Sequence, residues 1–70
     1  MDLVLLLRLD SARGFHSMAD ALKVANAFQE QGIDAVAELA PGDPAEGALI
    51  FYIKVPAEQL EKAKSLDIEY

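Results

Sequence analysis

The first apolar run of the chain alternates with a period of two. In the segment DLVLLLRLD, residues 2–10, every odd position is leucine, whereas the even positions from Val4 onward change from apolar residues to Arg8 and Asp10. Successive side chains of a β-strand point to opposite faces of a sheet, so this period is typical of a strand. We therefore predict a strand here, with its core-facing side formed by Leu3, Leu5, Leu7 and Leu9.

The period changes to that of a helix after Ser17. Ser17 and Asp20 resemble a capping box, and Gly32 is a helix stop that tolerates left-handed dihedral angles, with Ile33 closing onto Phe28. Apolar residues spaced by three and four positions predict one buried stripe. The predicted stripe consists of Met18, Ala21, Leu22, Ala25 and Phe28.

The rest of the chain divides into further elements by composition. Residues 34–40 predict a second strand, and residues 41–47 form a loop with two prolines and two glycines. The segment ALIFYIKVP, residues 48–56, is the best strand of the chain, because β-branched and aromatic residues dominate it. A helix is expected over residues 57–66, and residues 67–70 suggest a short final strand.

The order of these elements predicts the fold class. A β-α-β-β-α chain with an optional last strand, βαββα(β), is the ferredoxin-like α+β plan, in which two helices cover one face of an antiparallel sheet. The handedness rule for crossovers places the first and third strands side by side in the middle. We expect one domain spanning residues 1–70.

The expected second face of the sheet is unusually apolar. If the odd residues of the central strands face the helices, the even ones face away, and an exposed sheet face should carry polar residues instead. We predict a homodimer interface on this face, flanked by Arg8 and Lys54. A monomer that hides these residues by strand twist, and a groove for an apolar ligand or a partner helix, are the alternatives. The predicted interface residues are Val4, Leu6, Ile50 and Tyr52, with Val36 beside them.

Composition limits the possible functions. The 70-residue chain has no cysteine, which excludes disulfides and thiolate metal sites, and its formal net charge of −6 opposes binding to nucleic acid. A chain this short has a marginal core, for which oligomerisation is a common support. The apolar start lacks the basic residues and cleavage site of a signal peptide, and no stretch is long enough to cross a membrane, so we expect a cytoplasmic protein.

The segment from Asp10 to Ser17 connects a strand to a helix N-terminus. Free backbone N–H groups favour an anion there. The candidate anion-binding residues are Arg13, Gly14, His16 and Ser17. However, the segment matches no phosphate-binding motif, and a simple N-cap explains Ser17 with fewer assumptions, so we favour the cap.

Catalytic and metal chemistry receive little support. His16 with Asp10 could form a general-base pair, which in so short a chain would need a subunit interface to complete a site. Asp43 and Glu46 lie in a loop without the spacing of calcium ligands. We predict no catalytic residue, no metal and no cofactor.

Two segments carry a family resemblance. MADALKVANAFQEQGIDAVAEL, followed through a loop by IFYIKVPAEQLEKAKSL, resembles the small βαββα domains grouped as signal-transducing proteins, which share their plan with PII-type and ACT-type regulators. This resemblance implies binding of a small ligand or a protein by an oligomer. The helix ALKVANAFQEQG also resembles the first helix of DsrE-type sulfur-relay proteins, whose cysteine chemistry this chain lacks.

These observations favour a non-enzymatic binding or regulatory module that is a homodimer through its apolar sheet face, with a small anionic ligand as its candidate ligand. One alternative is an acidic adaptor or inhibitor that binds a basic protein partner. The other is a small enzyme with its site at a subunit interface.

Overall fold

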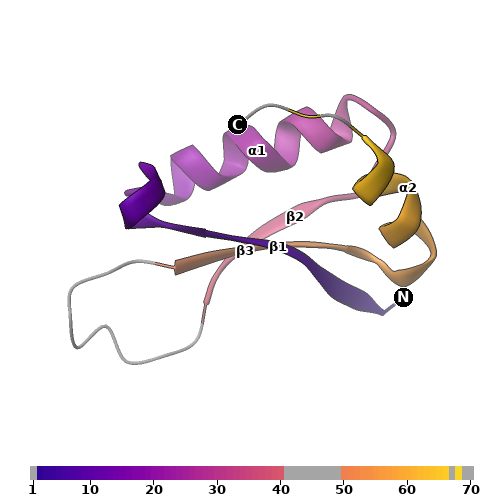
Figure 1. Cartoon of the computed structure of the whole chain (residues 1–70), viewed down its shortest axis with the longest axis horizontal. Helices are drawn as coiled ribbons and strands as arrows, with labels where there is room; N and C mark the ends of the chain where they lie inside the picture. The colour runs from indigo at the N-terminus through magenta and orange to yellow at the C-terminus, as the bar shows by residue number, and fades with distance from the viewer. Residues whose placement is uncertain (1, 41–49, 67, 69–70) are drawn as a thin grey trace.

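Three strands form one antiparallel sheet in the order β1-β3-β2 (Figure 1). The computed structural model describes residues 2–40, 50–66 and 68, with β1 over Leu3–Asp10, β2 over Val36–Leu39 and β3 over Ile50–Pro56. Each strand lies within a predicted one. The start of the predicted third strand, Ala48 and Leu49, lies outside the described residues.

Two helices pack against the same side of this sheet (Figure 1). Helix α1 spans Met18–Gln29, and α2 spans Leu60–Ser65 after a 3₁₀ turn, η2, over Ala57–Gln59. A second 3₁₀ turn, η1 over Ser11–Arg13, follows β1 directly. The predicted fold class, α+β with an antiparallel sheet and two helices, is confirmed at this level.

The central strand of the described sheet is β3. Its residues Phe51, Ile53 and Val55 are buried between β1, β2 and the helices, as their β-branched and aromatic character predicts. The predicted pairing of the first and third strands is confirmed, but β1 is an edge strand here. The final strand expected over residues 67–70 lies outside the described residues apart from Ile68, so the four-stranded ferredoxin-like plan stays a prediction.

The C-terminal end of α1 shows the predicted glycine stop. Gly32 has φ +85°, and its N–H donates to the Gln29 carbonyl, while the Ile33 N–H donates to the Phe28 carbonyl over 3.1 Å. These two bonds form a Schellman motif, which needs a residue that adopts positive φ without strain. Ile33 and Phe28 are both buried. The predicted hydrophobic closure of this helix is thus confirmed.

The buried stripe of α1 differs from the predicted one. Val24 is buried, whereas Leu22 is 45% exposed and Met18 also lies at the surface. The buried positions follow one another by three, one and three residues, which defines a narrow stripe, and Leu22 lies about 100° around the helix from its neighbour Ala21. The buried residues are Ala21, Val24, Ala25 and Phe28.

A β-bulge in β1 overturns the predicted orientation of its first half. Leu5 pairs with Lys54 and Leu7 pairs with Ile53, so Leu6 is an extra residue without an opposite partner. One extra residue reverses the alternation of side chains along the strand. Before the bulge it is therefore Val4, opposite the buried Val55, that packs toward the core.

The predicted interface set must be corrected accordingly. Val4 and Leu6 pack against the hydrophobic core on the helix side of the sheet instead of facing away from it. Ile50 and Tyr52 alternate with the buried residues of β3, and so they lie on the face away from the helices, as predicted. Leu3 and Leu5 replace the two lost residues on that face and are 43% and 50% exposed.

Candidate functional site

The loop after β1 begins with a capped 3₁₀ turn. The Asp10 carboxylate accepts a hydrogen bond from the Arg13 N–H at 3.2 Å, and the Gly14 N–H donates to the Ser11 carbonyl. Gly14 has φ +93°, a left-handed conformation that glycine adopts readily. Asp10 is therefore engaged in a local cap, and no hydrogen bond joins it to His16 among the described residues.

The N-terminus of α1 is capped by its own side chains. Ser17 Oγ accepts from the Asp20 N–H, and Asp20 Oδ2 accepts from the His16 N–H at 3.0 Å. This pair of bonds is close to the predicted capping box, although the acidic side chain reaches one residue further back. The His16 N–H lowers the pKa of the Asp20 carboxyl below its ordinary value of 3.8.

The candidate anion-binding residues lie in one loop, but the caps already engage some of the backbone donors of this loop. The N–H groups of Arg13 and His16 already bind carboxylates of the chain itself. An external anion would have to compete with the Asp20 carboxylate at the positive end of α1. The side chains of Arg13, His16 and Ser17 are exposed. Anion binding by this loop stays a prediction, and the hydrogen bonds present are those of the favoured cap.

The cap gives a testable pH dependence. Because folding lowers the pKa of Asp20, the ionised carboxylate stabilises the folded state. This stabilisation is fully present above pH 3.8 and is lost as the pH falls through the pKa of the folded state. We expect Asp20→Asn to be less stable than the wild type near neutral pH and to lose this acid-dependent component. Urea unfolding followed by circular dichroism at several pH values below 5 measures the difference.

Ser17→Ala serves as the control for this prediction. It removes the other capping side chain without removing a titratable group, and should lower stability by about 0.5–2 kcal/mol at neutral pH. Most of the acid-dependent component should persist. If the difference in unfolding free energy between the wild type and Asp20→Asn stays constant from neutral to acid pH, the role assigned to Asp20 is wrong.

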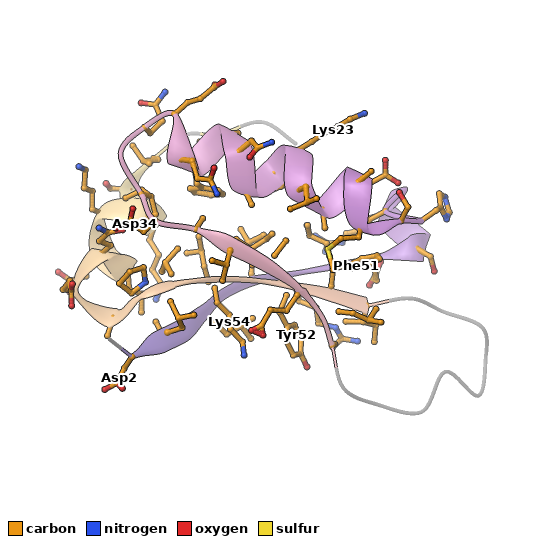
Figure 2. The ribbon with its side chains drawn as sticks, turned by 180° about the vertical axis from the view of Figure 1, so that it is seen from behind. Asp2, Lys23, Asp34, Phe51, Tyr52 and Lys54 are labelled. Atoms are coloured by element: carbon orange, nitrogen blue, oxygen red, sulfur yellow. The ribbon has the colours of Figure 1, made fainter. Side chains whose placement is uncertain are left out.

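The face of the sheet away from the helices is the larger candidate site. We call it the outer face, and define it by the residues that alternate with the core. Figure 2 shows Tyr52 and Lys54 pointing away from α1, whereas Phe51 points toward it. Strand register assigns the other members. The outer face consists of Leu3, Leu5, Arg8, Val36, Glu38, Ile50, Tyr52 and Lys54.

The outer face is organised in rows across the three strands. One row places Arg8, Tyr52 and Glu38 side by side, and the neighbouring row places Leu5, Lys54 and Val36 side by side. The two rows combine exposed aliphatic side chains with charges of both signs. Sequence reasoning included Val36 and Lys54 at this interface but missed Leu3, Leu5 and Glu38, because the bulge that exposes the leucines has no signal in an uninterrupted apolar run.

One ion pair joins the two rows. Lys54 Nζ lies 3.2 Å from Glu38 Oε2 and 6.0 Å from the centre of the Tyr52 ring. The ion pair draws the lysine toward β2, because Glu38 belongs to that edge strand. Both side chains are partly exposed, so the pair contributes little stability by itself. Its main effect is to hold the ammonium group of Lys54 near the edge strand β2.

A hollow of about 340 Å³ lies on the other side of the molecule, between β1 and the two helices. Leu6 and Leu7 at the bulge line this hollow, and so does Lys64 from the last turn of α2. Sequence reasoning did not find this site. The lining residues are Leu6, Leu7, Phe28, Ala63, Lys64, Leu66 and Ile68.

Metal and membrane chemistry find no support in the described part of the chain. No group of three or more histidine, aspartate or glutamate side chains gathers there in a way that would hold a metal ion. The loop carboxylates Asp43 and Glu46 lie outside the described residues. Within residues 2–40 and 50–66, neither helix combines the length and the apolar character needed to cross a bilayer.

Comparisons with known proteins add no relationship. No family model, no curated protein and no solved structure matches this chain significantly. The resemblance to small signal-transducing domains therefore stays a prediction from sequence pattern.

Proposed function

We propose that this protein is a non-enzymatic, cytoplasmic binding or regulatory module that acts as a homodimer through its outer face. The observation that carries the proposal is the apolar content of that face, where Leu3, Leu5 and Val36 expose 43%, 50% and 36% of their surface. Full burial of such a side chain is worth about 1.5–3 kcal/mol. A sheet face of this composition is typical of a surface that another protein covers.

The ferredoxin-like plan and the resemblance to PII-type and ACT-type regulators support the same reading. Regulators of this plan are oligomers, and a split β-α-β arrangement with β3 between β1 and β2 is common to the plan. A 70-residue chain buries little apolar surface by itself, and covering the outer face would bury more of it. The small anionic ligand of the proposal would bind at the loop that contains Arg13, Gly14, His16 and Ser17.

A second copy of the chain fits the outer face because its rows are complementary to themselves. A two-fold axis parallel to β3, between two sheets stacked outer face to outer face, places β1 of each copy over β2 of the other and keeps the rows aligned. Arg8 then meets Glu38 of the partner subunit, and Leu5 meets the partner's Val36. Each row thus pairs opposite charges or apolar side chains.

The central position of each row lies on this axis. Tyr52 would stack on Tyr52 of the partner subunit, an aromatic contact that suits an interface. Lys54 would meet its own copy, but its 3.2 Å ion pair with Glu38 draws the ammonium group toward β2 and away from the axis. The ion pair therefore removes the one like-charge contact of the arrangement.

Oligomeric state as a function of concentration tests the proposal. Light scattering coupled to size exclusion over a dilution series should show a dimer that dissociates on dilution. Tyr52→Glu should be a folded monomer at every concentration. Leu22→Glu, which places the same charge on the exposed side of α1, is the matched control and should remain dimeric. A wild type that stays monomeric at millimolar concentration would refute the homodimer.

Charge reversal tests the direction of the axis separately. Arg8→Glu and Glu38→Arg should each weaken the dimer, because each creates two like-charge contacts per interface. The double variant should recover only part of the wild-type affinity, because Glu38→Arg also removes the ion pair that holds Lys54 away from the axis. If the wild type is a dimer but the double variant recovers no affinity, the proposed interface stands and the proposed axis is wrong.

A further inference from the structure

Strand β2 has one side that no other described strand covers, and we call this side the open edge. The strand pairs with β3 alone. The Ala40 N–H donates to the Ile50 carbonyl at 2.8 Å, and the residues that bond to the partner alternate with those that do not along an antiparallel strand. The N–H and C=O groups of Ala37 and Leu39 therefore point to the open edge, where no hydrogen bond from the described residues reaches them.

One side of α1 runs along the open edge. The Ala35 carbonyl, just before β2, accepts a hydrogen bond from Gln29 Nε2 at 2.8 Å, so the Gln29 side of the helix lies beside this strand. Met18 and Leu22 lie on the same side, because they precede Gln29 by about three and about two helical turns. Both side chains are exposed.

Leu39 lies at the level of these two helix residues. It is opposite the buried Phe51, so its side chain is on the helix side of the sheet. Helix α1 and strand β2 run in opposite directions (Figure 1). From the hydrogen bond that joins them, Leu39 lies about 13 Å along the strand, and Leu22 and Met18 lie about 10 Å and about 16 Å back along the helix. The exposed fractions of Met18, Leu22 and Leu39 are 36%, 45% and 56%.

Free backbone groups beside exposed apolar side chains are complementary to an added β-strand. An extended segment can pair with Ala37 and Leu39 through their free N–H and C=O groups, and its side chains then alternate between the two faces of the sheet. On the helix side they would contact Met18, Leu22 and Leu39. On the other side they would lie beside Val36. The open edge therefore fits a polypeptide with an aliphatic residue at every second position.

The charge around β2 indicates the charge of this polypeptide. Residues 24–53 contain five aspartates and glutamates but no lysine, arginine or histidine, in a chain whose formal net charge is −6. Such a segment attracts a basic partner, whereas a second copy would bring the same negative segment to the edge. Within β2, Glu38 is paired with Lys54, so the attraction acts at long range and not through one contact.

We propose that the open edge of β2 binds an extended segment of a basic protein, in which aliphatic residues alternate with lysine or arginine. The aliphatic residues lie against Leu22 and Leu39, and the basic residues lie on the other face of the extended sheet. This proposal goes beyond the homodimer, because stacking two outer faces leaves the edges of both sheets uncovered.

A seven-residue peptide of alternating valine and lysine, blocked at both ends, is the probe that tests the site. Amide shifts followed by nuclear magnetic resonance should saturate and should be largest at Ala37, Leu39 and Leu22. Shifts that do not saturate, or that are largest at Arg8 and Tyr52 on the outer face, would overturn the proposal.

Two N-methylated peptides of equal composition test the backbone pairing. The valines share a face with Ala37 and Leu39, so their N–H groups are the ones that bond to the open edge. N-methylation of the valines should weaken binding by at least about 10-fold, because hydrogen bonds are lost and the methyl groups clash. N-methylation of the lysines, whose N–H groups point away from β2, should change binding by less than about 2-fold. Equal binding of the two peptides would reject strand addition.

Serine variants test the apolar contacts. Leu22→Ser and Leu39→Ser should each weaken the peptide by about 5-fold, which corresponds to about 1 kcal/mol of lost apolar contact, and should leave the homodimer unchanged. Leu5→Ser is the matched control, because Leu5 is 50% exposed but lies on β1, and should weaken the dimer without affecting the peptide. Loss of self-association in Leu22→Ser and Leu39→Ser would mean that a second copy occupies the edge, and would overturn the proposal.

The charge of the partner is tested with the peptide itself. A peptide with glutamate in place of every lysine should show no saturable shifts, and added salt should weaken the lysine peptide. If the glutamate peptide binds as tightly as the lysine peptide, the basic partner is wrong. Peptide binding and self-association are measured separately, so a wild type that stays monomeric would refute the homodimer and leave this proposal standing.

Discussion

Ile53→Ala should remove a large part of the free energy of unfolding at 25 °C. Ile53 is fully buried at the middle of the central strand, where it lies between Leu7 of β1 and Ala37 of β2. Truncating a buried isoleucine to alanine costs about 2–5 kcal/mol, because apolar contacts are lost and a cavity remains. A chain of this length has a total stability of only about 3.5–10 kcal/mol.

Urea unfolding at a fixed protein concentration measures this effect, and a loss of dispersed amide resonances would report full unfolding. Ile53→Val removes one methylene group and should cost about 0.5–1.5 kcal/mol. Leu22→Ala, at a position 45% exposed on α1, should change stability by no more than about 0.5 kcal/mol. If Ile53→Ala were as stable as Leu22→Ala, β3 would not be the centre of the core.

The strand and helix pattern predicts most of this fold because it is locally consistent. In β3, apolar and polar residues alternate from Phe51 to Lys54, so pattern and packing agree. In α1, the glycine at position 32 ends the helix where only a positive φ fits. These features depend on neighbours in the sequence, and the sequence therefore contains the information that decides them.

The orientation of β1 could not be predicted for the opposite reason. Residues 3–7 are all apolar, so they fit either face equally well, and only Arg8 onwards distinguishes the two sides. The bulge at Leu6 then reverses the alternation without a glycine or other local signal. The outer face and the hollow both depend on this one residue, because the bulge places Leu5 on the outer face and Leu6 at the hollow.

The loop after β1 illustrates a different limit. Its residue types suit both an anion site and a pair of helix caps, since both use the same backbone N–H groups, and the sequence favours the cap only because Ser17 then needs fewer assumptions. The caps themselves are seen only in the placement of Asp10 and Asp20, whose carboxylates accept from the N–H groups of Arg13 and His16. That placement depends on side-chain geometry, which a sequence pattern does not contain.

Val4→Asp should destabilise the folded monomer far more than Leu5→Asp, although the two residues are adjacent. Val4 packs against the core opposite the buried Val55, so a carboxylate there should destabilise the monomer by about 3 kcal/mol or more. Leu5 lies opposite Lys54 on the outer face, so the same change should alter monomer stability by less than about 1 kcal/mol. A strand without the bulge predicts the reverse.

The second readout of this pair is the dimer. Because a two-fold interface contains every substitution twice, Leu5→Asp should raise the dimer dissociation constant by about 100-fold, which corresponds to about 2.7 kcal/mol. Urea unfolding of the monomeric Tyr52→Glu background isolates the effect on folding, and light scattering of the single variants measures the effect on association. If Leu5→Asp unfolds that background while Val4→Asp does not, Leu5 faces the core. The outer face would then lose its most exposed leucine, and the hollow would lose the bulge that shapes its wall.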